Sequence, residues 1–419
     1  NKNNMLNINN SSDKFYLVIG LGRSGYWAAK FLNSKNKRVI VLEQQNNYQF
    51  KTLKKELEII GIEVFLNIPF EFKEISHLIK HIECVILSPV IHSDNKTVKK
   101  LKDAGIKLIG EMNLGWSNLE DINWVGITGT NGKTTVTHLL SHILSQNNLK
   151  APSAGNIGKP ICKYAYEYNK NKKFDWIIAE LSSYQIEIAN EIRPKIGIWT
   201  TFTPDHLERH KTLENYFNIK NQLLIGSEIR IYNYDDKYLR SHEKYLAKGT
   251  WISADLKGKS LHNCDFWIDN SGFVVEKGKQ LFKSNIFKLR GKHNLQNLLL
   301  ATSAARKIGL NGDSIRNSLK TYKPLPHRFE SIYKSENIEI INDSKATNFD
   351  SSIAAINSLL EKQIIIAGGK IKEGNYKKWA KTIREKCEVV FLYGENAQEL
   401  KQILLTAGFQ KSIFIHVEL

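Results

Sequence analysis

The stretch "ITGTNGKTTVTHLL" (Ile127–Leu140) joins a short apolar run, a glycine-rich turn and the start of a helical pattern. A strand that leads through such a turn into a helix gathers backbone N–H groups around an anion at the helix N-terminus. The common phosphate-loop pattern G-x-x-x-x-G-K-[ST] has a glycine where Ile127 stands here. The nearer glycines, Gly129 and Gly132, give the shorter form G-x-x-G-K-T. This form keeps the anion-binding turn and the helix N-terminus, so it still predicts a phosphate site.

The side chains after the turn predict that the phosphate belongs to ATP. Lys133 can reach the β- and γ-phosphates, and the Thr134 hydroxyl can bind Mg²⁺. A helix cap with an incidental lysine is the alternative, and it leaves the other motifs of the chain unexplained. The predicted ATP contacts in this loop are Gly129, Thr130, Asn131, Gly132, Lys133, Thr134 and Thr135.

Composition limits the class of protein. The chain has 419 residues, of which 42% are hydrophobic, which is enough for several globular domains. No run of about 18 apolar residues occurs, and the polar N-terminal stretch lacks the apolar core of a signal peptide. We therefore expect a cytoplasmic protein without stable membrane insertion. The four cysteines form no C-x-x-C, so we expect buried thiols and neither a disulfide framework nor a thiolate metal site.

The formal net charge of +18 is spread along the chain and forms no long basic block. A nucleic-acid-stimulated ATPase is one function that such a charge permits, but no motif combining aromatic and basic residues supports it. We expect no nucleic-acid partner. The positive field would instead help to attract anionic substrates such as nucleotides.

Strand-like and helix-like segments alternate along most of the chain, which predicts an α/β fold with doubly wound parallel sheets. We predict three domains: a Rossmann-like domain at 1–111, a central P-loop ATPase domain at 112–323 and a Rossmann-like domain at 324–419. The second boundary falls at the proline-containing segment Pro324–Pro326. Because "SIFIHVEL" ends the sequence without a closing helix, we expect the chain to be a fragment.

A second glycine turn lies near the start of the chain. Gly20, Gly22 and Gly25 form G-x-G-x-x-G between a predicted strand and a predicted helix. Glu43 ends the next predicted strand about 20 residues further on, as in dinucleotide-binding folds. The pattern indicates a nucleotide diphosphate site but does not distinguish NAD from a UDP-sugar. A nicotinamide-dependent oxidoreductase is therefore a rival reading, although it leaves Gly129–Thr135 without a role.

Seven motifs together resemble those of the Mur ligase superfamily. They are "SPVI" (Ser88–Ile91), "GTNGKTT" (Gly129–Thr135), "GNIG" (Gly155–Gly158), "ELSSYQ" (Glu180–Gln185), "TPDHLERH" (Thr203–His210), "PHRFE" (Pro326–Glu330) and "NDSKATN" (Asn342–Asn348). The resemblance covers nearly the whole chain. It implies an ATP-dependent amide ligase that works through an acyl phosphate, in the branch that adds D-glutamate to UDP-N-acetylmuramoyl-L-alanine for peptidoglycan synthesis. A sister ligase that adds another amino acid is the nearest alternative.

The resemblance also implies roles for individual residues. The catalytic residues would be Lys133, Glu180, His206 and Lys220, the last of them carbamylated. Two Mg²⁺ ions would be bound by Thr134, Glu180, His206 and Lys220. The ATP contacts outside the loop would be Asn294, Asn297, Arg328 and Asp343. The UDP-sugar contacts would be Gly22, Arg23, Ser24, Glu43, Ser88, Asn156, Ser182 and Gln185.

The D-glutamate contacts would be Thr347 and Lys372. The sequence departs from the family pattern here, because Lys370 stands where the family usually has an aspartate. The segment that brings a serine and a phenylalanine to D-glutamate in the family has no counterpart before Leu419. We expect a monomer whose partners are UDP-N-acetylmuramoyl-L-alanine and D-glutamate.

Overall fold

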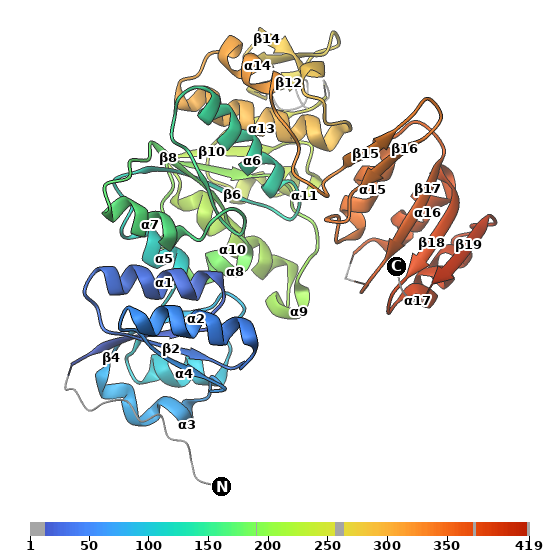
Figure 1. The fold of residues 1–419 in the computed structure, drawn as a ribbon. Coiled ribbons are helices and arrows are strands. Elements are labelled where there is room, and N and C mark those ends of the chain that lie inside the picture. Colours follow the sequence, from blue (N-terminus) through green and yellow to red (C-terminus); the bar gives the residue numbers. More distant parts are fainter. Residues whose placement is uncertain (1–12, 190, 256–263, 372–373, 417–419) are drawn as a thin grey trace. The chain divides into compact units, whose positions relative to one another are not determined.

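The computed structural model describes residues 13–189, 191–255, 264–371 and 374–416 (Figure 1). Over these ranges the chain divides into two compact units. The first is formed by residues up to 126, 149–197 and 219–228, and the second by residues 127–148, 198–218 and from 229 onward. Parallel sheets with helices recur along the chain, which confirms the predicted α/β class. The division into three domains at residues 111 and 323 stays a prediction.

The first unit contains a five-stranded parallel sheet with the order β3-β2-β1-β4-β5. Its strands are β1 (Phe15–Ile19), β2 (Val39–Glu43), β3 (Glu63–Leu66), β4 (Ile82–Leu87) and β5 (Lys107–Gly110). In register, Val18 of β1 lies opposite Val41 of β2 and Ile86 of β4. The central strands are apolar and buried, as expected where helices cover both faces of a parallel sheet. The order in which successive strands are added to the sheet reverses between β1 and β4, and such folds bind nucleotides at this point.

Helices surround this sheet and connect it to the rest of the first unit. They are α1 (Arg23–Ser34), α2 (Tyr48–Ile59), α3 (Phe72–Ile75), η1 (Ser76–His81), α4 (Lys96–Asp103) and α5 (Glu111–Trp116). The unit also contains β7 (Ser153–Gly155), α7 (Ile161–Asn169), β8 (Trp176–Glu180) and α8 (Ser183–Ile188). α1 packs against α7, where the Trp27 and Tyr166 ring centres are 5.8 Å apart. The Lys163 ammonium lies 4.6 Å from the centre of the Trp27 ring, a cation–π contact.

A second sheet has nine strands in the order β14-β13-β12-β11-β10-β9-β6-β8-β7. Its remaining strands are β6 (Asn123–Thr128), β9 (Ile196–Trp199), β10 (Ile229–Asn233), β11 (Thr250–Ser253), β12 (Phe266–Ile268), β13 (Phe273–Glu276) and β14 (Lys279–Lys283). β10, β11 and β12 run parallel, whereas β12, β13 and β14 form an antiparallel meander. The phosphate-loop turn follows β6 directly, at the carboxyl end of that strand.

The helices that accompany this part of the chain are α6 (Lys133–Gln146), α9 (Leu207–His210), α10 (Leu213–Gly226), α11 (Lys237–Ser241), η2 (Glu243–Tyr245), η3 (Ser284–Ile286), α13 (Lys292–Ile308) and α14 (Gly312–Lys320). α6 packs against α13 (Figure 1). Buried leucines on α6 and alanines and leucines on α13 make this contact apolar and close. α6 is thereby fixed along its length, and so is the loop that leads into it.

Residues 330–416 form two small sheets. β15 (Glu330–Lys334) pairs with β16 (Glu339–Asn342) in antiparallel fashion, and β17 (Gln363–Gly368), β18 (Cys387–Tyr393) and β19 (Ser412–His416) form a parallel sheet. The helices are α15 (Phe349–Asn357), α16 (Tyr376–Lys386) and α17 (Ala397–Thr406). Ile353, Trp379, Val390 and Leu404 belong to one buried cluster between these helices and the sheet.

The four cysteines are free and buried, which confirms the expectation of buried thiols. No helix within the described ranges has the length and apolar character that crossing a membrane requires.

Candidate active site

The phosphate loop has a backbone that only glycine adopts easily. Gly129 has φ of 146° and Gly132 has φ of 85°. A Cβ placed on Gly129 would lie 2.0 Å from Oγ1 of Thr200, and one on Gly132 would lie 2.6 Å from Oδ1 of Asn297. Both glycines are therefore required by conformation and by space. The turn ends at Gly132, which is the N-cap of α6, so the free amides of the first helical turn face the loop.

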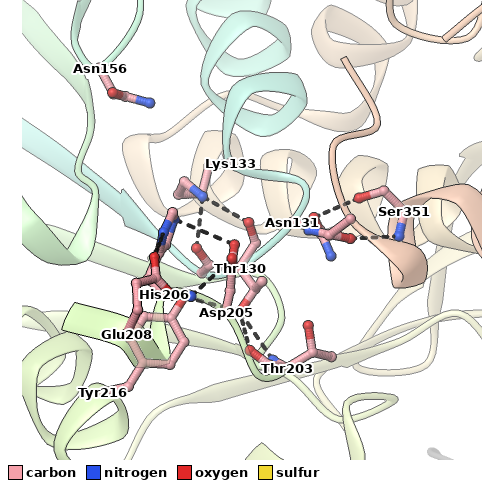
Figure 2. A network of polar contacts seen from close by, with 12 residues as sticks. Thr130, Asn131, Lys133, Asn156, Thr203, Asp205, His206, Glu208, Tyr216 and Ser351 are labelled. Carbon is pink, nitrogen blue, oxygen red and sulfur yellow. Dashed lines mark hydrogen bonds and ion pairs between the residues drawn. The ribbon is translucent and has the colours of Figure 1, made fainter. Parts of the chain in front are cut away.

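A neighbouring segment, Thr200–Thr203, supports the loop (Figure 2). The Thr130 amide donates to the Thr201 carbonyl at 2.8 Å. The Asn131 amide donates to Oγ1 of Thr201 at 2.9 Å, and Oγ1 of Thr130 donates to the Thr203 carbonyl at 3.0 Å. Of this segment only Thr203 belongs to a motif identified from the sequence, and Thr200 and Thr201 could have been found from their position directly after a buried strand.

The segment Thr200–Thr203 is itself held by Asn233, the last residue of β10, and by Asp236, the N-cap of α11. The side-chain amide of Asn233 donates to the Thr200 carbonyl at 2.9 Å. Oδ2 of Asp236 accepts the Phe202 amide hydrogen at 2.7 Å. Burial raises the pKa of Asp236, and the three backbone amides that donate to its carboxylate oppose this effect. Neither residue belongs to a motif identified from the sequence.

Three predicted ATP residues lie together at the loop. The Lys133 ammonium donates to the carbonyls of Gly129 at 2.8 Å and Thr130 at 2.9 Å, so it lies over the turn (Figure 2). Oγ1 of Thr134 accepts a hydrogen bond of 2.9 Å from Nη2 of Arg328. The fold thus brings a lysine, a hydroxyl and an arginine from positions almost 200 residues apart to one end of α6.

The turn that carries Arg328 is strained. His327 has φ of 63° and Phe329 has φ of 48°, so both flanking residues adopt the left-handed conformation that non-glycine residues rarely occupy. The Phe329 amide donates to Oδ1 of Asp343 at 2.9 Å, and burial raises the pKa of that carboxyl. Nε of Arg328 is buried and has no hydrogen-bond partner within the described part of the chain. Strained backbone and unsatisfied polar atoms concentrate at functional sites.

The other predicted ATP residues are buried near the start of α13. Nδ2 of Asn294 donates to the Arg290 carbonyl at 2.7 Å, and Nδ2 of Asn297 donates to Oδ1 of Asn294 at 3.3 Å. Asn297 also lies close to Gly132, because a Cβ on that glycine would be 2.6 Å from Oδ1 of Asn297. Thr135, in the first turn of α6, completes the predicted set.

His206 follows the supporting segment and lies among carboxylates (Figure 2). Its Nε2 is 3.5 Å from Oδ2 of Asp205, and its Nδ1 is 3.7 Å from Oε1 of Glu208. The residue has φ of 56°, a left-handed backbone at the N-cap of the short helix α9.

In the first unit, Glu180 is held by the "GNIG" turn. Nδ2 of Asn156 donates to Oε1 of Glu180 at 2.9 Å, and the Asn156 amide donates to the Glu180 carbonyl at 3.0 Å. Glu180 is 1% exposed, and its second oxygen, Oε2, has no hydrogen-bond partner within the described ranges. Lys220, on the part of α10 that belongs to the first unit, is also 1% exposed.

The residues of the first glycine turn take part in its local structure. Nη2 of Arg23 donates to the Gly158 carbonyl, which joins this turn to the "GNIG" turn. Oε2 of Glu43 accepts the Leu21 amide hydrogen at 2.7 Å, and Oε1 accepts that of Gln45 at 2.8 Å. Gly22 is the N-cap of α1, Ser24 lies in its first turn, and Ser88 follows β4 at the neighbouring strand end.

Ser182 and Gln185 form a capping box at the start of α8. Oγ of Ser182 accepts the Gln185 amide hydrogen at 3.3 Å, and Oε1 of Gln185 accepts that of Ser182 at 3.0 Å. This S-x-x-Q arrangement satisfies backbone donors that the helix leaves free. Of the predicted D-glutamate contacts, Thr347 is exposed on the loop before α15, and Lys372 lies outside the described residues.

Within the described ranges, no group of three or more His, Cys, Asp or Glu side chains could hold a metal ion. The buried, unpartnered Oε2 of Glu180 and the Thr134 hydroxyl are nevertheless the hard oxygen donors that Mg²⁺ prefers. Glu180 belongs to the first unit and Thr134 to the second, and each donor by itself suits a Mg²⁺ ion that keeps several waters.

Comparison with protein families gives two matches. The Mur ligase middle domain matches residues 127–305, and the glutamate ligase domain of Mur ligases matches residues 327–418. A protein of Prochlorococcus marinus strain MIT 9312 is 59% identical over 403 residues, which is 96% of this chain and 86% of the relative. A protein of Synechococcus sp. strain CC9902 is 40% identical, over 95% of this chain and 87% of the relative. Both relatives are named UDP-N-acetylmuramoylalanine–D-glutamate ligase.

Solved structures support the fold. The UDP-N-acetylmuramate–alanine ligase of Thermotoga maritima matches with a TM-score of 0.62 and 17% identity, over 97% of this chain and 90% of that one. A pseudomurein peptide ligase of type C from Methanothermus fervidus matches with a TM-score of 0.61 and 20% identity, over 96% and 89%. Since the family matches include the phosphate loop and its Arg328 partner, and high identity extends over nearly the whole chain, this protein belongs to the Mur ligase family.

Proposed function

We propose that this chain is an ATP-dependent ligase that joins D-glutamate to UDP-N-acetylmuramoyl-L-alanine in peptidoglycan precursor synthesis. The observation that carries the proposal is the phosphate loop, supported by Thr200–Thr203 and contacted by Arg328 at 2.9 Å through Thr134. Mur ligases depend on ATP, and the relatives at 59% and 40% identity carry the name of this D-glutamate-adding activity.

The chemistry requires the protein to position reactants and neutralise charge. A bare carboxylate resists attack by an amine, because its negative charge repels nucleophiles. Transfer of the γ-phosphoryl group to the carboxylate forms an acyl phosphate, and the amine then displaces inorganic phosphate. Lys133, Arg328 and the amides at the start of α6 offset the phosphate charges during this transfer.

Magnesium ions belong to the proposal, with Thr134, Glu180, His206 and carbamylated Lys220 as the protein ligands that the family resemblance implies. The ions would neutralise charge that develops on the phosphate oxygens. In carbamylation the Lys220 ammonium first loses one proton, and the neutral amine then bonds to CO₂ and releases a second proton, so that a cation becomes an anion. The deep burial of Lys220 supports this modification, because a buried ammonium is costly to desolvate.

The remaining parts of the proposal concern the binding of the UDP-sugar and D-glutamate, the domain organisation, the oligomeric state and the cellular location. The UDP group would bind at the glycine turn after β1, with Gly22, Arg23, Ser24, Glu43 and Ser88, and the muramoyl-alanine part near Asn156, Ser182 and Gln185. D-Glutamate would contact Thr347 and Lys372. The predicted three-domain organisation, a monomeric state, a cytoplasmic location and the absence of nucleic-acid partners complete the proposal.

Phosphate release tests this function directly. The protein is supplied with ATP, Mg²⁺ and UDP-N-acetylmuramoyl-L-alanine, with or without D-glutamate, and the product is identified by mass spectrometry. We expect release that depends on D-glutamate and a product one glutamyl residue heavier than the substrate. Equal turnover with L-alanine, L-lysine or meso-diaminopimelate in place of D-glutamate would indicate a sister activity. NADH binding that is indifferent to UDP-muramoyl compounds would support the oxidoreductase.

A further inference from the structure

The side chain of Asn131, in the phosphate loop, is bound by residues more than 200 positions later in the chain (Figure 2). Its Oδ1 accepts a hydrogen bond of 2.7 Å from Oγ of Ser351 and one of 3.0 Å from Nδ2 of Asn348. Both donors lie at the N-terminus of α15, and Asn131 lies between Gly129 and Gly132. A loop residue with glycines nearby has little local support, so these two bonds contribute to its placement.

The two donors are rigidly held. Asn348 is the N-cap of α15, and its Oδ1 accepts the Ser351 amide hydrogen at 2.9 Å. The helix is anchored by Phe349, Ile353 and Ile356, which are buried in the cluster beneath the β17–β18–β19 sheet. The Asn348 side chain therefore caps its own helix through one atom and contacts the phosphate loop through the other.

The backbone of Asn131 is fixed by a different segment of the chain, Thr200–Thr201. Its amide donates to Oγ1 of Thr201 at 2.9 Å, and its carbonyl accepts from the hydroxyls of Thr200 and Thr201. With both the backbone and the side chain bound, the peptide that leads into Gly132 and the α6 N-terminus has one orientation. The direction in which the loop amides point at a phosphate is thus set jointly by the Thr200–Thr203 segment and by α15.

We propose that Ser351 and Asn348 are positioning residues for the ATP phosphates, which act through the side chain of Asn131. They do not touch the nucleotide; they orient the loop that binds it. The inference rests on the proposed ATP-binding function. It also couples that site to the Asn342–Asn348 loop, which ends at Asn348 and carries the predicted D-glutamate contact Thr347. Binding events at the two loops should then influence each other reciprocally.

Two adjacent serines give a matched test. Ser351 donates to Asn131, whereas Ser352 accepts a hydrogen bond of 3.0 Å from Nε1 of the buried Trp379. We expect Ser351→Ala to weaken Mg·ATP binding, measured by isothermal titration calorimetry, by about 5- to 20-fold, the range for loss of one or two hydrogen bonds. Ser352→Ala should lower the melting temperature and leave the ATP dissociation constant within about 2-fold of the wild type.

A second pair of variants separates loop positioning from helix stability. Asn348→Asp keeps an oxygen that caps α15, but it replaces the donor to Asn131 with a carboxylate oxygen. We expect weaker Mg·ATP binding without loss of the fold. Ser351→Thr retains the hydroxyl donor and should bind Mg·ATP nearly as the wild type does. The double variant Asn131→Ala/Ser351→Ala should be no weaker than Asn131→Ala alone, because both changes remove the same contact.

The outcomes distinguish this inference from the proposed function. If the wild type binds Mg·ATP and Ser351→Ala and Asn348→Asp bind it equally well, the positioning role is refuted while the ATP site stands. Additive losses in the double variant would also refute it. If the wild-type chain binds no Mg·ATP, the proposed function itself fails.

Discussion

Asn156 donates its side-chain amide to Oε1 of Glu180 at 2.9 Å, and Oε2 of the same carboxylate is buried with no hydrogen-bond partner in the described part of the chain. One oxygen is thus fixed, and the other is left available in a site closed to bulk water. A buried carboxylate oxygen without a partner is costly unless a cation or a ligand donor completes it. This arrangement suggests that Asn156 orients Glu180.

The first prediction concerns this pair. Asn156→Ala removes the bond that orients the carboxylate, so we expect the Mg²⁺ concentration for half-maximal activity to rise by about 10-fold, as when a residue that orients a metal ligand is lost. Mg²⁺ titrations of ATP-dependent phosphate release measure this. Glu180→Gln should remove activity at every Mg²⁺ concentration. If Asn156→Ala needs the same Mg²⁺ concentration as the wild type, Asn156 does not contribute to metal binding.

The second prediction concerns the loop lysine. Lys133 donates to the Gly129 and Thr130 carbonyls and is not among the buried residues of α6, so Lys133→Ala should leave the fold intact, as judged by circular dichroism. We expect phosphate release to fall by about 1,000-fold or more, because a positive charge at the γ-phosphate is lost. If Lys133→Ala releases phosphate at the wild-type rate, the prediction that this loop binds ATP is wrong.

The third prediction concerns Lys220. Protein equilibrated with ¹³C-bicarbonate should show a carbamate carbonyl signal by NMR, because burial makes the ammonium form of Lys220 costly to desolvate. Lys220→Arg cannot form the carbamate and serves as the control. The same signal in Lys220→Arg would show that another amine carries the modification.

The fourth prediction concerns Asn233 and Asp236, which hold the Thr200–Thr203 segment beside the loop. Asn233→Asp replaces the donor to the Thr200 carbonyl with a carboxylate, so we expect Mg·ATP binding to weaken by about 10-fold near neutral pH. At lower pH the new carboxyl regains a proton that it can donate, and part of the affinity should return. Asp236→Ala should lower both the ATP affinity and the melting temperature, because it removes acceptors for three backbone amides. A loss in Asn233→Asp that does not change with pH would argue against the donor role.

The fifth prediction concerns pH and stability. Burial raises the pKa of Glu111 to about 7, although its Oε1 accepts the Cys162 amide hydrogen at 2.7 Å. Between the ordinary value of 4.5 and about 7, the folded chain holds a proton that the unfolded chain has lost. Its contribution to stability is therefore complete below pH 4.5 and falls as pH rises through 7, by at most about 3 kcal/mol.

Glu111→Gln is the control for this effect, because it keeps the acceptor and does not titrate. Melting temperatures of both proteins at pH 5, 6, 7 and 8 measure the difference. We expect the wild type to lose stability relative to Glu111→Gln across this range. If the difference in melting temperature between the two proteins is the same at every pH, Glu111 does not titrate between pH 5 and 8.

Local conformation explains which features the sequence could predict. The phosphate loop and the Gly20–Gly25 turn follow from glycine spacing between a strand and a helix, and the α/β class follows from regular alternation. The sequence analysis did not predict the capping box of Ser182 and Gln185, although its S-x-x-Q spacing is a local pattern typical of helix starts. Their predicted contact with the sugar substrate stays a prediction beside this local role.

Contacts between distant segments could not be predicted in this way. The Asn131–Ser351 and Phe202–Asp236 bonds join residues whose types are common in turns and helix caps, and no spacing rule relates them. The resemblance to a known family implied that Arg328 contacts ATP, but not that it donates a hydrogen bond to Thr134. Pairing across the chain depends on the tertiary fold, which a motif does not encode.

The left-handed residues on either side of Arg328 have a further consequence for how this protein tolerates change. Glycine at position 327 or 329 would relieve backbone strain of about 1 kcal/mol or more at each site. The same substitutions would make the backbone on either side of Arg328 more flexible, so its guanidinium would be held less firmly beside Thr134. Selection for heat resistance alone would therefore favour glycine here, and selection for turnover would oppose it.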